Sequence, residues 1–263
     1  MDIPAARRAR ICEIVYGRQK ATVAELAQLL DVSEETIRRD ISALHGEGAI
    51  QKVHGGAVAP SSPSFGAFER RQISKFAEKQ GIAHAALACL PEGESVMING
   101  GSTSEIFATI AAPQKAFSVI TNSPPVARAF WRADRGADVF AIGGQLRNDT
   151  EETLGDIALQ QLAQFNVRHA VLTADGVDAG QVDYFRADAA AIARMMISRA
   201  RHVTLLADHT KLERHALFGA GELSEIHRLV TDRPPPDVVL AKLERAGVEL
   251  VVANGIPADV ESM

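Results

Sequence analysis

The chain has 263 residues, of which 46% are hydrophobic and 23% are charged, and its formal net charge is −5. This composition is typical of a soluble globular protein. The absence of an apolar run of membrane-span length, or of an apolar N-terminal signal, favours a cytoplasmic protein with no membrane partner. Cys12 and Cys89 are too few for a disulfide framework, and no Cys or His cluster surrounds them, so the sequence predicts no metal site.

The N-terminal part of the chain predicts three short helices followed by a wing. Thr22 and Glu25 have the spacing of a capping box that starts the second helix, and Ser33 supplies the start signal for the third. In the third helix, apolar residues recur at i, i+4 and i+7 from Ile37 and define its buried side. Residues 50–58 contain two adjacent glycines and predict a short hairpin or wing.

Two short helices, a three-residue break and a third helix have the order of a helix-turn-helix. The first 58 positions contain eight basic and eight acidic residues, so DNA binding would depend on their arrangement rather than on net charge. Arginines opposite the buried side of the third helix can contact phosphates or guanine, and hydroxyls near its start can donate to phosphates. The alternative is a packing or dimerisation module with a solvated charged face. The candidate DNA-binding residues are Thr22, Ser33, Glu35, Thr36, Arg38, Arg39, Ser42, Lys52 and His54.

The remainder of the chain predicts an α/β domain. Residues 59–66 are rich in Pro, Ser and Gly and indicate a linker. Short β-rich runs then alternate with helical stretches, which favours a mainly parallel sheet. The runs are residues 95–98, 117–120, 138–142, 170–173, 203–207, 229–231 and 249–252, and the helical stretches include 104–111, 126–133, 189–198 and 237–246. The predicted organisation is therefore a DNA-binding domain at 1–58, a linker at 59–76 and a sensing domain at 77–263.

Polar residues gather where the predicted strands end. In an open α/β sheet the ligand crevice lies outside the carboxyl ends of the strands, so these segments are expected to converge. Glycine amides, hydroxyls and a helix start suit a phosphate, while carboxylates suit sugar hydroxyls. Each feature also has a plainer interpretation, since a Gly-Gly pair is more often a turn and a single lysine more often lies on the surface. The candidate effector-binding residues are Asn99, Gly101, Ser102, Thr103, Thr121, Asn122, Gly143, Asp175, Gly176, Asp178 and Lys211.

The motifs TIRRD (residues 36–40) and HGGA (residues 54–57) carry a family resemblance. The stretch from Thr22 to Ala57 resembles the winged helix-turn-helix of the DeoR family. Residues 78–232 resemble that family's effector domain, whose fold is similar to ribose-5-phosphate isomerase and CoA transferases. The matching segments are INGGST, VITNS, AIGGQLR, ADGVD and LADHTK. The resemblance implies a repressor that binds operator DNA, needs no cofactor and is released by a phosphorylated sugar or polyol.

Within the family, FGAFERRQI, LADHTKLER and VTDRPPP are similar to repressors of glycerol-3-phosphate metabolism, which implies glycerol 3-phosphate as the first candidate effector. Two segments depart from the family pattern. The family's loop usually reads Asp-x-Gly-Thr-Thr, whereas this chain has Asn99 at the first position and Ser102 at the fourth. Ala193 stands where the family commonly has a basic residue. Ser102 keeps a hydroxyl donor and Asn99 removes a charge, whereas the departure at Ala193 implies a pocket of different shape.

The sequence is also compatible with two other functions. One is a sugar-phosphate isomerase-like enzyme with a DNA-binding appendage, and the other is a DNA-binding protein without a ligand. Asp175 and Asp178 are similar to carboxylates of ribose-5-phosphate isomerase, but no lysine occurs from Asp175 to Thr210. An isomerase needs a general base and an electrophile, so we predict no catalytic residues and no enzyme activity. Because one winged helix makes few base contacts, we expect a homodimer or homotetramer on repeated half-sites.

Overall fold

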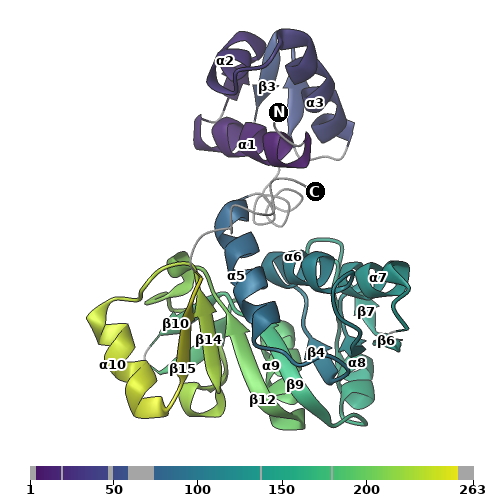
Figure 1. Cartoon of the computed structure of the whole chain (residues 1–263), viewed down its shortest axis with the longest axis vertical. Coiled ribbons are helices and arrows are strands. Elements are labelled where there is room, and N and C mark those ends of the chain that lie inside the picture. Colours follow the sequence, from purple (N-terminus) through teal and green to yellow (C-terminus); the bar gives the residue numbers. More distant parts are fainter. Residues whose placement is uncertain are drawn as a thin grey trace. The chain divides into compact units, whose positions relative to one another are not determined.

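The computed structural model describes residues 4–18, 20–46, 50–58, 74–136, 138–178 and 180–253. The chain divides into two compact units, Met1–Phe76 and Ala77–Met263 (Figure 1). Most of the predicted linker, residues 59–73, lies outside the described residues. Each unit has its own apolar core and is treated separately below.

The N-terminal unit is a winged helix-turn-helix. Its elements are α1 (Pro4–Arg18), β1 (Lys20–Thr22), α2 (Val23–Leu29), α3 (Glu34–Gly46), β2 (Gln51–Val53) and β3 (Gly56–Val58). The three strands form an antiparallel sheet in the order β1-β3-β2. The predicted helices and wing are present, and only the short β1 was not anticipated.

The helices of this unit are held by an apolar core with contributions from all three. The buried side of α3 consists of Ile37, Ile41 and Leu44, as their spacing predicts. Cys12 of α1 is fully buried in the same core and acts as a small apolar residue. Gly56 lies so close to β1 that a Cβ atom there would be 2.3 Å from the Ala21 carbonyl oxygen. This approach explains the second glycine of HGGA.

The C-terminal unit is built around a seven-stranded parallel sheet in the order β15-β14-β12-β9-β4-β5-β6. These strands correspond to all seven predicted β-rich runs. They are β4 (Ser95–Ile98), β5 (Ser118–Thr121), β6 (Val139–Ala141), β9 (Val167–Thr173), β12 (Ala200–Leu206), β14 (Arg228–Thr231) and β15 (Glu249–Val252). Its helices are α5 (Phe76–Ala88), α6 (Ser102–Ala111), α7 (Pro124–Ala133), α8 (Asp156–Leu162), α9 (Ala187–Arg199) and α10 (Asp237–Ala246).

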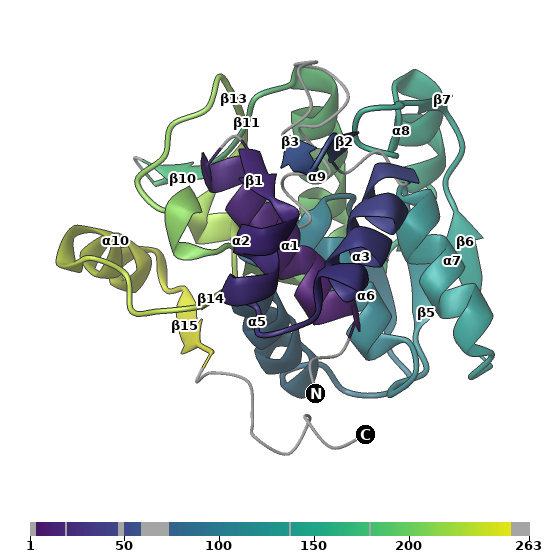
Figure 2. The same ribbon diagram turned by 90° about the horizontal axis from the view of Figure 1, so that it is seen from above.

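Helices cover both faces of this sheet. One apolar cluster joins the sheet to α5, α6 and α7 through residues such as Ile82, Phe107 and Phe130. A second cluster joins it to α8, α9 and α10, with Leu162 and Met196 among its members. Figure 2 shows α10 beside β14 and β15 at one end of the sheet, and α7 beside β5 and β6 at the other. The predicted mainly parallel α/β domain is confirmed.

The sequence did not predict several short elements of this unit. The strands β7 (Gln145–Leu146) and β8 (Thr153–Leu154) form a small antiparallel pair. A second small sheet contains β10 (Gly176–Asp178), β11 (Gln181–Tyr184) and β13 (Phe218–Glu222). These short strands contain no continuous apolar run, and their pairing depends on partners distant in sequence.

Candidate functional site

The exposed side of α3 carries the predicted DNA-reading residues. The side chains of Glu35 and Arg39 are 64% and 76% exposed, with Arg39 Nε 3.7 Å from Glu35 Oε1. Arg38 Nη2 donates to Glu34 Oε2 at 2.6 Å, also on the surface. Exposed ion pairs of this kind contribute about 0.2–1 kcal/mol. Both arginines can therefore exchange these carboxylates for DNA at little cost.

The wing lies against the same helix. Lys52 Nζ donates to Ser42 Oγ at 3.0 Å, so these two predicted residues are brought together. His54 is exposed at the turn between β2 and β3. Ser33 Oγ accepts from the Thr36 backbone N–H at 3.2 Å and caps the start of α3. Thr22 forms the predicted capping box with Glu25 at the start of α2, so its hydroxyl is engaged within the fold.

Sequence reasoning missed the role of Asp40, the last residue of TIRRD. Its side chain is 4% exposed and accepts from Arg7 Nε at 2.6 Å and from Arg8 Nε at 3.1 Å. Asp40 thus ties α1 to the helix that carries Arg38 and Arg39. Its place directly after the exposed Arg38 and Arg39 in TIRRD was the available signal.

In the sensor unit, Asn99 joins the carboxyl ends of β4 and β9. It is 3% exposed. Its Oδ1 accepts from the Thr173 N–H at 2.9 Å and from Ser104 Oγ at 3.2 Å. Its Nδ2 donates to the Thr173 carbonyl oxygen at 3.1 Å and to the Tyr184 hydroxyl at 3.2 Å. Asn99 therefore fixes the loop that begins the predicted phosphate site.

The next residues place positive charge at the start of α6. Gly101 has a φ of +131° and no side chain caps the helix there. Ser102 Oγ accepts from Lys79 Nζ at 3.0 Å, and Lys79, on α5, is only 4% exposed. Sequence reasoning missed Lys79, which precedes the loop by more than twenty residues. Thr103, the second residue of α6, is 6% exposed.

The ends of β5 and β6 are joined by a buried polar cluster. Asn122 is fully buried, and its Nδ2 donates to the Thr153 carbonyl oxygen at 3.1 Å. Asn122 Oδ1 has no hydrogen-bond partner within the described residues. Thr121 Oγ1 accepts from the Ser123 N–H at 3.0 Å, and the Gly143 N–H donates to Gln161 Oε1 at 2.8 Å. These residues line the same edge as Asn99 because β4, β5 and β6 are parallel neighbours.

Asp175 lies close to the Asn99 network. Its Oδ2 accepts from the Phe185 N–H at 3.0 Å. Burial raises the pKa of the Tyr184 phenol, and the nearby carboxylates of Asp175 and Glu152 raise that pKa further. Glu152 also packs against the loop, since a Cβ atom added at Gly100 would lie 2.3 Å from the Glu152 side chain. Asp175 and Glu152 are therefore neighbours of the Asn99 loop.

Three other predicted residues have different surroundings. Asp178 Oδ1 is 3.7 Å from Lys242 Nζ of α10, an ion pair at the side of the small sheet. Lys211 ends a 3-10 turn (His209–Lys211) after β12 and is half-buried. Gly176 is packed against Arg214, where a Cβ atom would lie 2.0 Å from the carbonyl oxygen. The ion pair with Lys242 places Asp178 beside α10.

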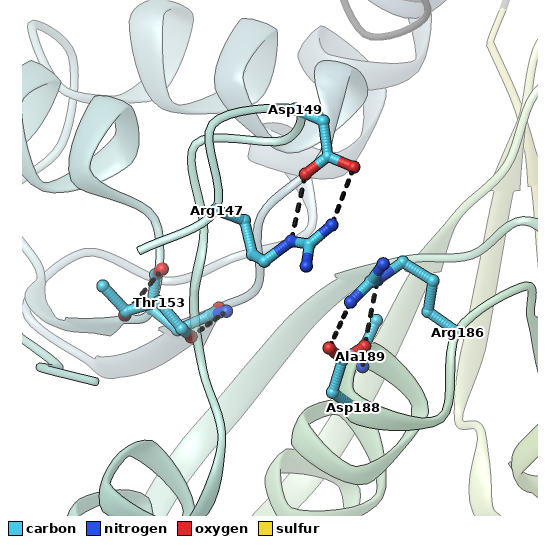
Figure 3. A network of polar contacts seen from close by, with 7 residues as sticks. Arg147, Asp149, Thr153, Arg186, Asp188 and Ala189 are labelled. Carbon is cyan, nitrogen blue, oxygen red and sulfur yellow. Dashed lines mark hydrogen bonds and ion pairs between the residues drawn. The ribbon is translucent and has the colours of Figure 1, made fainter. Parts of the chain in front are cut away.

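Two arginine–aspartate pairs face each other near these loops (Figure 3). Arg147 donates from Nε to Asp149 Oδ1 and from Nη2 to Oδ2, both at 3.1 Å. Arg186, just before α9, donates to both carboxylate oxygens of Asp188. The hydrogen bond and charge of Arg147 lower the pKa of Asp149, and Arg186 adds to the lowering. Sequence reasoning missed both arginines.

At the opposite edge of the sheet, three histidines form a row across β9, β12 and the start of β14. The ring centroids of His169 and His202 are 5.5 Å apart, and those of His202 and His227 are 5.2 Å apart. Burial lowers the pKa of His169, and the charge of His202 lowers it further. Burial also lowers the pKa of His227.

This row predicts acid sensitivity. A histidine whose pKa is depressed by folding contributes stability that is present above its unfolded pKa of about 6.5 and is lost as pH falls below it. We expect His169→Phe to lose less unfolding free energy than the parent chain between pH 7 and pH 5, as measured by urea unfolding. His54→Phe, at an exposed position, should keep the parent's pH dependence. Equal acid sensitivity in the parent and His169→Phe would contradict this.

Among the described residues, no group of three or more His, Cys, Asp or Glu side chains is arranged to hold a metal ion. In the same part of the chain, no helix is both long and apolar enough to cross a membrane.

A winged helix-turn-helix followed by an α/β domain with polar loops at one sheet edge defines a transcription regulator with a separate sensor domain. The chain belongs to the DeoR family. Residues 7–63 match the DeoR-like helix-turn-helix domain, and residues 74–233 match the DeoR C terminal sensor domain.

Relatives match along nearly the whole chain. The HTH-type transcriptional repressor CsqR of Escherichia coli (strain K12) is 32% identical over 247 residues, which cover 94% of this chain and 94% of the relative. The glycerol-3-phosphate regulon repressor of the same organism is 30% identical over 241 residues, covering 91% and 95%. These relatives are repressors, so the isomerase alternative is not favoured.

Among solved structures, ribose 5-phosphate isomerase A from Methanocaldococcus jannaschii aligns with a TM-score of 0.39 and 15% identity. The alignment covers 53% of this chain and 55% of that one. Similarity at this level supports no functional conclusion.

Proposed function

We propose that this chain is a repressor that binds operator DNA through α3 and the wing, and that a phosphorylated sugar or polyol releases it. Glycerol 3-phosphate is the first candidate effector, because one relative that matches 91% of the chain is a glycerol-3-phosphate regulon repressor. The proposal that the chain binds a phosphorylated effector rests on the buried Lys79 ammonium, which lies beside the Ser102 hydroxyl at the start of α6.

A phosphate suits that position for two reasons. A helix start carries about half a positive charge, and its first backbone N–H groups point outward toward an anion. Because no side chain caps α6 at Gly101, these groups meet an anion directly. The ammonium of Lys79 adds a further positive charge next to them.

The neighbouring loops suit hydroxyl groups. Asp175 and the buried Asn122 Oδ1 are acceptors, and a buried acceptor without a partner is stabilised when a ligand hydroxyl donates to it. Arg147 and Arg186 offer donors at the rim, since their pairs with Asp149 and Asp188 are partly exposed. We infer that the ligand releases DNA by binding the DNA-free arrangement of a homodimer or homotetramer more tightly than the DNA-bound one.

A substitution in α3 tests the proposed operator binding. We expect Arg39→Ala to weaken operator binding about tenfold, because a base-contacting arginine contributes about 1–3 kcal/mol. Fluorescence anisotropy at one fixed salt concentration measures the change. Arg18→Ala, at the exposed end of α1, is the matched control and should bind like the parent chain. Unchanged binding by Arg39→Ala would remove this residue from the interface.

The effector half is tested at the sheet edge. We expect Thr103→Val and Lys211→Ala to bind operator normally and to need at least about tenfold more effector for release, since each lacks one polar contact to the ligand. Thr109→Val, on the exposed side of the same helix, should respond like the parent. Loss of operator binding in either variant with the fold intact would contradict the proposed separation of roles.

The whole proposal is tested by anisotropy on DNA from upstream of the protein's own gene, with and without glycerol 3-phosphate and a panel of other phosphorylated sugars and polyols. Specific binding that one phosphate ester loosens supports both halves. If no compound of the panel changes specific binding, the proposed response to a phosphorylated effector is contradicted, while the proposed operator binding stands.

A further inference from the structure

A pocket lies at the amino ends of the main-sheet strands, on the opposite side of the sheet from the loops of the candidate effector site. It has a volume of about 550 Å³ and is formed where β4, β9 and β12 begin. This volume is in the range of small-molecule sites. Because the sheet is parallel, the amino ends of these strands are separated from the Asn99 loop by the length of the strands.

Arginines dominate the charged lining of this pocket. They are Arg168 on β9, Arg199 at the end of α9 and Arg201 on β12, and Glu94 is the only acidic residue of the lining. Arg168 Nε is 3.6 Å from Glu94 Oε2, so that carboxylate is already engaged. Within the described parts of the chain, Arg199 and Arg201 form no ion pair. The carboxyl end of α9 offers about half a negative charge, which leaves two guanidinium groups mostly uncompensated.

Two further features lie beside the pocket. Arg228 lies on the same edge and is paired with Glu249 at 2.8 Å. The row of three histidines also lies here. Burial, His202, Arg168 and Arg228 together lower the pKa of His169, while Glu94 opposes them. Burial is the first of these causes and would disfavour an anion as well, whereas the charges of Arg168 and Arg228 would favour one.

We propose that this arginine pocket, comprising Arg168, Arg199 and Arg201, is a second ligand site that binds a small phosphate-bearing anion. Guanidinium groups present paired N–H donors that match phosphate oxygens, whereas a lysine ammonium acts as a point charge. The concave shape favours a small molecule over the phosphodiester backbone of DNA. This inference does not depend on the identity of the effector.

The test uses the full chain and sodium pyrophosphate as the probe, with binding measured by isothermal titration calorimetry. We expect the double variant Arg199→Gln/Arg201→Gln to bind pyrophosphate at least about tenfold more weakly than the parent. The control Arg128→Gln/Arg132→Gln changes the same net charge on exposed residues of α7 and should bind within about twofold of the parent. Thr103→Val should keep the arginine-pocket affinity, because it alters only the effector site.

Three results would overturn the proposal. The first is no pyrophosphate binding by the parent chain at millimolar concentration. The second is an equal loss of binding in both arginine double variants, which would indicate a general charge effect. The third is a less steep salt dependence of operator binding in Arg199→Gln/Arg201→Gln, by about two counterions, which would assign these arginines to DNA phosphates instead.

Discussion

Asp40→Ala is expected to destabilise the N-terminal unit by about 2–3 kcal/mol and to abolish operator binding at physiological temperature. Removing this 4% exposed carboxylate leaves Arg7 and Arg8 without the acceptor that joins α1 to α3. Removing a largely buried carboxylate costs this much because two charge-assisted hydrogen bonds between the helices are lost. A small unit has only several kcal/mol of stability in total.

Hydrogen–deuterium exchange on the full chain measures this effect locally. Peptides from α1 and α3 should exchange about 30- to 140-fold faster, since each 1.4 kcal/mol corresponds to a factor of ten, while peptides from β4 and β5 stay unchanged. Glu34→Ala is the matched control, because it removes an exposed ion pair of the same helix and should change stability by less than about 0.5 kcal/mol. Equal exchange in the parent and Asp40→Ala would show that the buried carboxylate contributes nothing.

Asn99→Asp, which restores the residue usual in the family's loop, is expected to destabilise the sensor unit by about 2–4 kcal/mol at neutral pH. The Nδ2 group of Asn99 donates to the Thr173 carbonyl oxygen at 3.1 Å. A carboxylate would place a charged oxygen against that carbonyl at a position that is 3% exposed. Of the four hydrogen bonds that the Asn99 side chain makes, the two that its amide donates would be lost.

The pH dependence separates this cause from a loss of packing. Burial raises the pKa of an introduced carboxyl group, so its cost is present above that pKa and diminishes as the pH falls and the group is protonated. Urea unfolding at pH 7 and pH 5 should therefore show a smaller difference between Asn99→Asp and the parent at the lower pH. Asn166→Asp, at an exposed loop position, should match the parent at both. A difference that grows on acidification would refute the hydrogen-bond explanation.

The sequence by itself determined the two-domain plan, the DNA-reading helix and the main sheet. These features depend on local signals: the capping box of Thr22 and Glu25, the spacing of Ile37, Ile41 and Leu44, and apolar runs long enough to mark seven strands. The polar loops were also found from sequence, because parallel strands bring their carboxyl ends to one edge.

The tertiary structure alone decided which of these residues meet. Lys79 reaches Ser102 across 23 positions, Asn99 bonds to Thr173 across 74, and Arg7 bonds to Asp40 across 33. No periodicity or spacing encodes such pairs, because each depends on how distant elements pack. The arginine pocket has the same origin: Arg168 and Arg201 look like ordinary surface residues until β9 and β12 align side by side.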